Sequence, residues 1–139
     1  MFNSNDITLY NSYYDRATET TKYKRTYLHG VDWQGKQATT VIEKGLLSAD
    51  SIQIFIPYDV NCSKQYIGPK AFKRLQDEER DLYFTFKSGD KIVKGIIDFE
   101  LTGVKPNNIA YLEDYYDDVI NIISVVDCEL TRHWEIGGE

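Results

Sequence analysis

The side chains best suited to chemistry are two histidines and one cluster of carboxylates. His29 and His133 lie far apart in the sequence, so a metal ion bound by both would need a third ligand supplied by the fold. The carboxylates of the cluster are Glu113, Asp114, Asp117 and Asp118. Their oxygens could bind a divalent cation, but their spacing lacks the D-x-D-x-D-G pattern of a calcium loop. We therefore expect a solvated loop or an acidic patch that faces a partner.

The motifs of nucleotide-binding and hydrolytic enzymes are absent from the sequence. It contains no Walker motif, GxGxxG, GxSxG or HExxH, and Gly137-Gly138 is too short a glycine run to cradle a phosphate. Cys62 and Cys128 belong to no CxxC motif and have no neighbour at the spacing typical of zinc ligands. We therefore expect a protein that is not an enzyme and that binds no metal and no cofactor.

The cysteines and the N-terminal residues bear on the compartment. Residues 1–8 are mostly polar, which does not match a signal peptide, and no apolar run is long enough to span a bilayer. A chain kept in a reducing compartment holds its cysteines as thiols. The sequence therefore predicts two free thiols and no membrane association.

The charge balance argues against tight binding of nucleic acid. The formal net charge is −6, and binding of phosphates requires a basic stripe that displaces counterions. The basic residues form only two short clusters, which are Lys22, Lys24 and Arg25, and Lys70, Lys73 and Arg74. An acidic surface along which DNA passes without adhering remains compatible with this balance.

Alternation of apolar and polar residues predicts one all-β domain over residues 1–139, an antiparallel small barrel or sandwich with one or two short helices in loops. Strands are expected within 7–10, 22–33, 37–47, 49–58, 82–86, 92–99 and 119–126, with an edge strand at 133–136. Ile52, Ile54 and Ile56 show the strongest alternation. The stretch 13–21 is expected to be a loop or an edge.

Turn and cap residues refine this prediction. The composition of Asp32–Lys36 predicts a turn between the strands 22–33 and 37–47, with Gly35 at positive φ. Gly95 predicts a bulge or bend in the strand 92–99. Asn107 or Asn108 is expected to cap a short helical turn that carries Leu112.

Residues 59–81, here called the excursion, differ from the strands around them. A short helix is expected within 67–75, with Pro69 early in it, and residues 76–81 are expected to be solvated. Long insertions between strands often carry function. The excursion is therefore the first candidate for an element that contacts a partner.

Tyrosine pairs in polar surroundings supply further candidates. Neighbouring residues on a strand point to opposite faces, so one member of each pair should point outward wherever the chain is extended. Outward tyrosines are common contact residues in protein interfaces. The candidate partner-contact residues are Tyr13, Tyr14, Tyr66, Lys70, Phe72, Lys73, Tyr115 and Tyr116.

Several segments together resemble an uncharacterised family of tailed-phage and prophage structural proteins of Gram-positive hosts. They are ITLYN, YKRTYLHGVDWQGK, SADSIQIFIPY, YIGPKAF, SGDKIVKG and HWEIGG, spread over most of the chain. Members are encoded among the head–tail joining genes. The resemblance implies a small β-barrel of the head-completion or stopper type, which forms a ring in the neck of the virion and has no catalytic residues to transfer.

The partners implied by this resemblance are copies of the same chain and the portal, adaptor and tail proteins of the virion. DNA would pass through the ring without tight binding, and assembly would take place in the host cytoplasm. A tail-completion or tail-terminator protein and a minor capsid protein remain alternatives in the same setting. An alternative of another class is a small β-barrel that binds a metal or ligand through His29, His133 and the acidic cluster.

Overall fold

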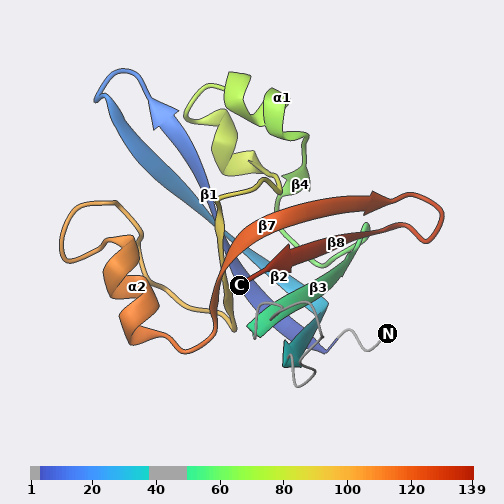
Figure 1. The fold of residues 1–139 in the computed structure, drawn as a ribbon. Helices are drawn as coiled ribbons and strands as arrows, with labels where there is room; N and C mark the ends of the chain where they lie inside the picture. Colours follow the sequence, from blue (N-terminus) through green and yellow to red (C-terminus); the bar gives the residue numbers. More distant parts are fainter. Residues whose placement is uncertain (1–3, 38–49) are drawn as a thin grey trace, which may run out of the picture.

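The computed structural model describes residues 4–37 and 50–139, and six of the described strands close into an antiparallel barrel. Around the barrel the order is β1-β2-β3-β8-β7-β6 (Figure 1). These strands are β1 (Asn5–Asp15), β2 (Thr20–Gln37), β3 (Asp50–Pro57), β6 (Lys91–Lys94), β7 (Val119–Cys128) and β8 (His133–Gly138). The prediction of an all-β fold built on a small antiparallel barrel is confirmed.

Aliphatic side chains that alternate along the strands fill the barrel. Ile54 and Ile56 of β3 are fully buried, as are Ile7 and Leu9 of β1. The other buried members of this core are Leu28, Val31, Phe84, Phe86, Ile92, Ile120, Ile122, Trp134 and Ile136. The alternation in the sequence therefore identified the inward face of β3 correctly.

Strands β1 and β2 form a hairpin, in which β1 is longer than the predicted strand 7–10. Strand β1 continues to Asp15 through part of the stretch expected to be a loop or an edge, and it pairs with β2 as far as Thr20. Gly30 has a φ of +83°, and the register of the pair shifts between Asn5 and Asp6. This bulge breaks the predicted alternation, so that Leu28 and Val31 both point into the barrel.

The predicted turn at Asp32–Lys36 is wrong. Strand β2 runs on through this stretch, where Trp33 pairs with Ile54 and Gly35 pairs with Ile52. Pairing with β3 satisfies the backbone groups that a local turn would have left to water, and so it overrides the turn preference of the residues. Of the expected return strand 37–47, Gln37 ends β2, and the remainder lies outside the described residues.

Strand β6 is shorter than the predicted strand 92–99 because the chain bends at Gly95, whose φ is +94°. Side chains of β1 and β2 hold the segment that follows. Thr8 Oγ1 donates to the Gly95 carbonyl at 2.8 Å, and the hydroxyl of Tyr10 donates to the Phe99 carbonyl at 2.7 Å. Tyr27 donates in the same way to Ile97 at 2.7 Å. These side-chain hydrogen bonds hold the segment after Gly95 in place of the backbone pairing that a longer β6 would make.

Strand β8 lies inside the sheet rather than at the predicted edge, since it pairs with β3 on one side and β7 on the other. Its last residues are glycines that lie against β7. A β-carbon at Gly138 would lie 2.6 Å from the Asn121 carbonyl oxygen, and one at Gly137 would lie 2.5 Å from Ser124 Oγ. At Gly138, where the neighbouring atom belongs to the backbone, only a residue without a side chain allows this close approach.

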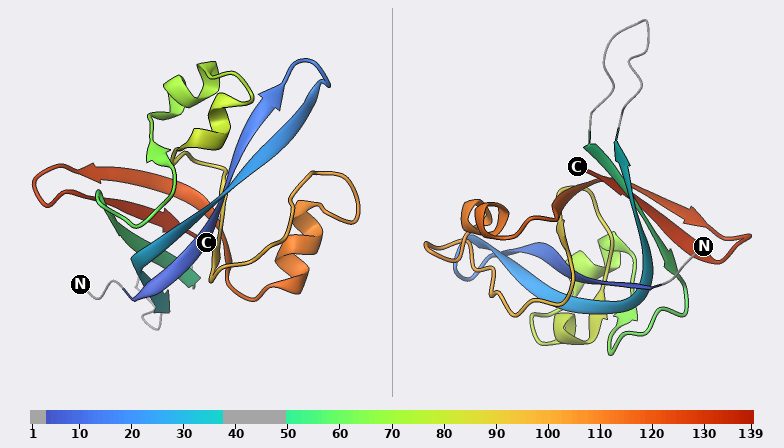
Figure 2. Two further views of the ribbon diagram at one scale, coloured as in Figure 1. Left: turned by 180° about the vertical axis from the view of Figure 1, so that it is seen from behind. Right: turned by 90° about the horizontal axis from the view of Figure 1, so that it is seen from below.

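The helices lie outside the barrel, on different sides of it (Figure 2). Helix α1 (Pro69–Arg74) and the 3-10 turn η1 (Glu79–Leu82) belong to the excursion, where β4 (Gln65–Tyr66) and β5 (Tyr83–Phe84) form a short parallel pair. The predicted strand 82–86 is thus reduced to β5. No helix in the described ranges is long and apolar enough to cross a membrane.

Helix α2 (Ile109–Tyr115) begins at the predicted cap. The Asn108 side chain accepts a hydrogen bond of 2.9 Å from the backbone N–H of Tyr111. Leu112 is fully buried in a second core outside the barrel, together with Tyr10 and Val93. This second core attaches α2 to the outer face of β1 and β6.

The packing of the barrel predicts a clear contrast between neighbouring isoleucines. We expect Ile54→Ala and Ile122→Ala each to lower the free energy of unfolding by about 2–5 kcal/mol, because each leaves a cavity at a fully buried position. Ile123→Ala is the matched control, since this side chain is 51% exposed and should change stability by no more than about 0.5 kcal/mol. Urea denaturation measures all of them. Equal stability of the Ile122 and Ile123 variants would contradict the assigned facing of β7.

Candidate functional site

A groove runs between the β1–β2 hairpin and helix α1. It has a volume of about 440 Å³, and we call it the excursion groove. Its lining includes Tyr13, Tyr14, Lys70, Phe72 and Lys73. The structure therefore brings together five of the eight residues that the sequence predicted as partner contacts, from two elements that are far apart in the chain.

Tyr13 is held rigidly beside this groove. Its hydroxyl donates a short hydrogen bond to Asp77 Oδ1, and the guanidinium of Arg80 lies 4.3 Å from its ring centroid. Burial and the Asp77 carboxylate raise the pKa of Tyr13, while the same hydrogen bond lowers the pKa of Asp77. Asp77 also lies 3.7 Å from Lys24 Nζ. These contacts join the excursion to β1 and β2.

Arg80 is buried, although the sequence placed it in a solvated stretch. Its guanidinium donates to the Phe72 carbonyl at 3.3 Å and to the Lys73 carbonyl at 2.9 Å. These carbonyls are at the C-terminal end of α1, where few backbone N–H groups remain to bind them. The Phe72 carbonyl also accepts from the backbone N–H of Leu75 at 3.2 Å. One buried cation therefore ends α1 and also stacks on Tyr13.

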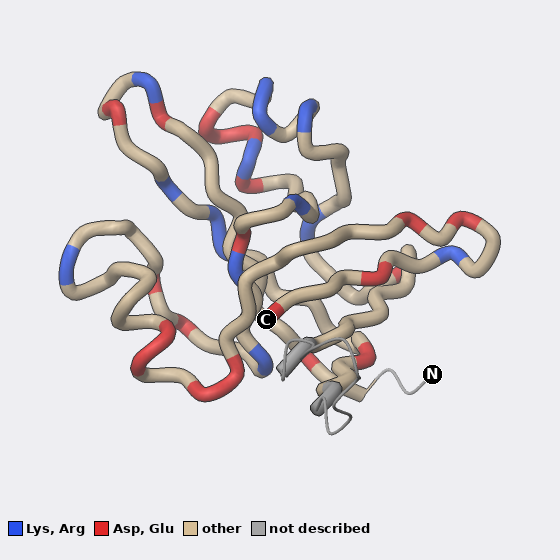
Figure 3. Tube along the Cα trace, viewed as in Figure 1, with Lys and Arg blue, Asp and Glu red and all other residues tan. Residues whose placement is uncertain are grey.

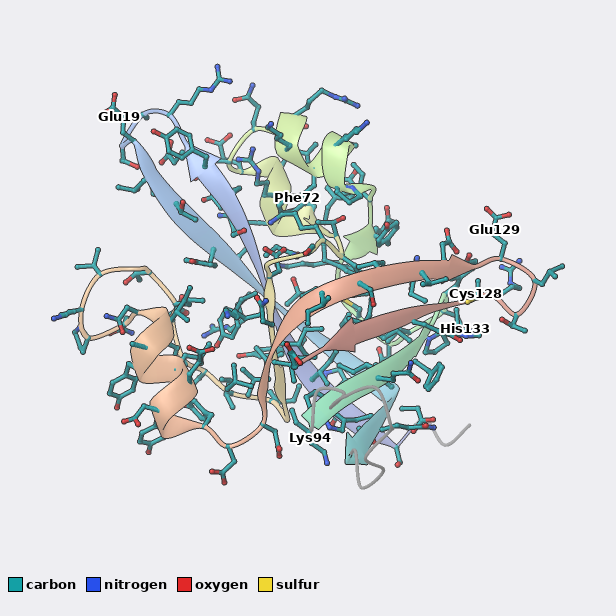
Figure 4. All side chains as sticks on the ribbon, viewed as in Figure 1. Glu19, Phe72, Lys94, Cys128, Glu129 and His133 are labelled. Atoms are coloured by element: carbon teal, nitrogen blue, oxygen red, sulfur yellow. The ribbon has the colours of Figure 1, made fainter. Side chains whose placement is uncertain are left out.

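The contact candidates in the groove differ in accessibility. Tyr14 is 58% exposed, whereas its neighbour Tyr13 is only 9% exposed, because the two point to opposite faces of β1. Phe72 belongs to α1, and its side chain is only 1% exposed because it lies on the buried side of this helix (Figure 4). A partner in the groove would therefore contact the exposed side chains of Tyr14, Lys70 and Lys73. The buried side chains of Tyr13 and Phe72 pack behind the surface of the groove.

A buried carboxylate stabilises the base of the hairpin near the groove. Asp90 is fully buried, and it accepts hydrogen bonds from Ser12 Oγ at 2.7 Å, Asn11 Nδ2 at 2.9 Å and Lys87 Nζ at 2.6 Å. Asn11 also accepts from the backbone N–H of Thr85 at 3.1 Å. A buried charge is tolerated only when it is paired and hydrogen-bonded, as it is here. Nothing in the sequence pattern around Asp90 predicted this network.

The exposed face of α1 is basic. Lys70, Lys73 and Arg74 are all exposed, and none of them makes a salt bridge within the described ranges. Cations in the last turn of a helix also suit its negative end. These charges are thus free to interact with another molecule.

Tyr66 lies away from the groove, in an aromatic group that borders the barrel core. Its ring centroid lies 4.6 Å from that of Trp134 and 5.8 Å from that of Phe84. It is half-buried, and burial raises its pKa. In this position it contributes to core packing rather than to the groove.

Tyr115 and Tyr116 lie on the opposite flank, at the end of α2. Phe99, Tyr111 and Tyr115 stack in sequence, with ring centroids 5.5 and 5.6 Å apart. Tyr115 is 66% exposed. Beside this stack are Asp114, Asp117 and Asp118, which form no salt bridge with any described residue. The acidic cluster predicted from the sequence is therefore an exposed patch at one end of α2.

The predicted pair of histidines is not assembled. His29 lies 3.5 Å from Asp6, and in the described part of the chain it belongs to no group of three metal-ligand side chains. Such a group does form around His133, with Cys128 and Glu135. Sequence analysis missed it because it searched for ligand spacings along the chain. The β-hairpin register, in which Cys128 pairs with His133, is the signal that would have found it.

Fold and surface together define a small all-β barrel protein with an excursion groove, a basic helix and an acidic helix. The chain belongs to a family described as a family of unknown function (DUF6751), whose model matches residues 2–139. No match was found among curated proteins or among solved structures. Family membership covers the whole barrel and assigns it no activity.

The double role of Arg80 predicts that its loss loosens the excursion. We expect Arg80→Met to lower the free energy of unfolding by about 1–3 kcal/mol, because it removes the side-chain donors of the Lys73 and Phe72 carbonyls. Hydrogen exchange should become faster over residues 69–82 while the barrel strands stay protected. Arg74→Met is the matched control, since that side chain is exposed, and it should leave both measurements unchanged. Unchanged exchange in the Arg80 variant would show that the guanidinium does not hold the excursion.

Proposed function

We propose that this protein is a structural subunit of a tailed-phage neck, of the head-completion or stopper type, which forms a ring between the portal or adaptor and the tail. The observation that carries the proposal is a basic helix and an acidic helix end on different sides of a closed barrel, where Lys70, Lys73, Arg74, Asp114, Asp117 and Asp118 form no salt bridge with any described residue. The resemblance of the sequence to phage head–tail joining proteins supports the setting.

Charge complementarity favours contacts between copies of the chain. The cations of α1 and the carboxylates at the end of α2 lie at separate places on the outside of the barrel (Figure 3). In a head-to-tail ring, α1 of one subunit meets α2 of the next, and every subunit uses both surfaces. Such pairing directs association and rejects wrong partners by repulsion between like charges.

Aromatic side chains beside these charges suit the same role. Tyr14 is exposed next to α1, and Tyr115 is exposed on α2. Tyrosine provides a large apolar area and a hydroxyl at low conformational cost, which is the reason for its enrichment in interfaces. A charged rim around exposed tyrosines is therefore an arrangement typical of a protein-binding surface.

The remaining features concern the passage of DNA. The net charge of −6 would repel a duplex from the wall of a channel rather than bind it. The partners in this proposal are copies of the chain, the portal or adaptor, and tail proteins, in the virion neck after assembly in the host cytoplasm. A tail terminator or a minor capsid protein would use the same surfaces, and position in the particle distinguishes them.

Deletion of the gene from its phage tests the proposed role. We expect filled heads and complete tails that do not join, and electron microscopy of lysates would count them. Density for a ring of this protein in the neck of intact particles is the matching structural result. Normal particles without the gene, or virions from which the protein is missing by mass spectrometry, would overturn the proposal.

A charge exchange tests the head-to-tail contact separately. We expect the variant Lys70→Glu/Lys73→Glu to fold normally and to fail in joining heads to tails, because α1 would then repel the acidic end of α2. Adding Asp117→Lys/Asp118→Lys should restore joining. Arg132→Glu, at an exposed residue of the turn between β7 and β8, reverses a charge outside α1 and α2 and is the control that should be silent. Failure of the fourfold variant to recover would reject this contact and leave the neck assignment to the deletion experiment.

A further inference from the structure

A group of potential metal ligands lies on the outer face of the β7–β8 hairpin. Cys128 is the last residue of β7 and pairs directly with His133, the first residue of β8 (Figure 4). Glu135 follows two residues later and so lies on the same face of β8. Trp134, between them, points into the barrel core. The hairpin therefore presents a thiol, an imidazole and a carboxylate side by side, away from the interior.

The distances within this group suit one small cation. The donor atoms of the three side chains all lie within 4.8 Å of one another, and His133 Nε2 lies 3.3 Å from Glu135 Oε1. In a tetrahedral zinc site with bonds of about 2.0–2.3 Å, the donor atoms are separated by roughly 3.3–3.8 Å. A contraction of about 1 Å, within reach of side-chain rotation, would complete the geometry.

The surroundings of His133 hold its imidazole in place, with Nε2 toward Glu135. Phe55 packs against the imidazole with ring centroids 5.8 Å apart, and the side chain is only 12% exposed. The ring is thus held in place in a partly desolvated position, as a metal ligand requires.

We propose that Cys128, His133 and Glu135 form a binding site for Zn²⁺ on the outer face of the β7–β8 hairpin. Thiolate and imidazole ligands select zinc and other late first-row metals over magnesium and calcium, which prefer oxygen ligands. Three protein ligands leave a fourth position for water or for a side chain of another molecule. The site lies apart from the excursion groove and does not depend on the proposed role in the phage neck.

Binding of Co²⁺ provides a direct test, because cobalt substitutes for zinc and reports its ligands in the absorption spectrum. Full-length reduced protein without a histidine tag is treated with a chelator and titrated with CoCl₂. We expect one equivalent to produce a thiolate-to-cobalt charge-transfer band and the visible bands of a tetrahedral ion, and ZnCl₂ to abolish both. Zinc should also raise the melting temperature, since it binds the native state.

Variants assign the ligands. Cys128→Ser should remove the charge-transfer band, while His133→Gln and Glu135→Gln should weaken binding by about tenfold or more. Cys62→Ser and Glu129→Gln are the matched controls and should bind as the wild type does. Circular dichroism of the metal-free variants confirms that each one folds. Absence of the band in the wild-type protein, its persistence in Cys128→Ser, or its loss in Cys62→Ser would overturn the proposal.

Discussion

Closure of the barrel depends on how closely β8 approaches β7. The space beside Gly138 is so small that even a methyl group would meet the Asn121 carbonyl and the Ile120 side chain at less than 3 Å. Because the two glycines allow this approach, β8 pairs on both sides and the six barrel strands have no unpaired edge in the barrel. Strand addition at the closed part of the barrel is therefore unfavourable, whereas residues 11–15 of β1, 20–31 of β2 and 122–128 of β7 extend beyond it with a strand partner on one side. In the described part of the chain, we expect contacts with other molecules at the helices, the groove and the hairpin segments outside the closed part.

The sequence predicted the parts of the fold that short-range chemistry determines. Ile54 and its alternating neighbours identified an inward strand face. Asn107 or Asn108 was expected to cap a helix, because such a side chain accepts a hydrogen bond from the backbone of the first helical turn, and Asn108 does so. The wrong prediction of a turn around Trp33 arises from long-range pairing rather than from short-range chemistry. A local turn preference there competes with pairing to β3, which is more than a dozen residues away in the chain, and no pattern of nearby residues reveals such pairing. Strand order and closure therefore had to come from the structure.

The candidate site was predictable in composition and not in arrangement. Tyr14 and Lys70 were expected to contact partners, and the structure places both beside one groove, but Phe72 is buried by the packing of α1. A charged residue such as Arg80 is normally assigned to the surface, and its burial is explained by its hydrogen bonds to the carbonyls at the end of α1 and its stacking on Tyr13. Cys128 was set aside because metal motifs are searched along the chain, whereas a hairpin aligns ligands across two strands.

The arrangement of charge outside the barrel bears on the symmetry of any assembly. A two-fold dimer brings identical surfaces together, so a contact centred on α1 would place its lysines against those of the second copy, and a contact centred on α2 would bring carboxylates together. Both arrangements are repulsive. Satisfying both helices in one two-fold contact would require them to share a face, yet α1 and α2 lie on different sides of the barrel (Figure 2). Head-to-tail contact pairs opposite charges at every interface, and it closes into a ring when the rotation between subunits divides a full turn.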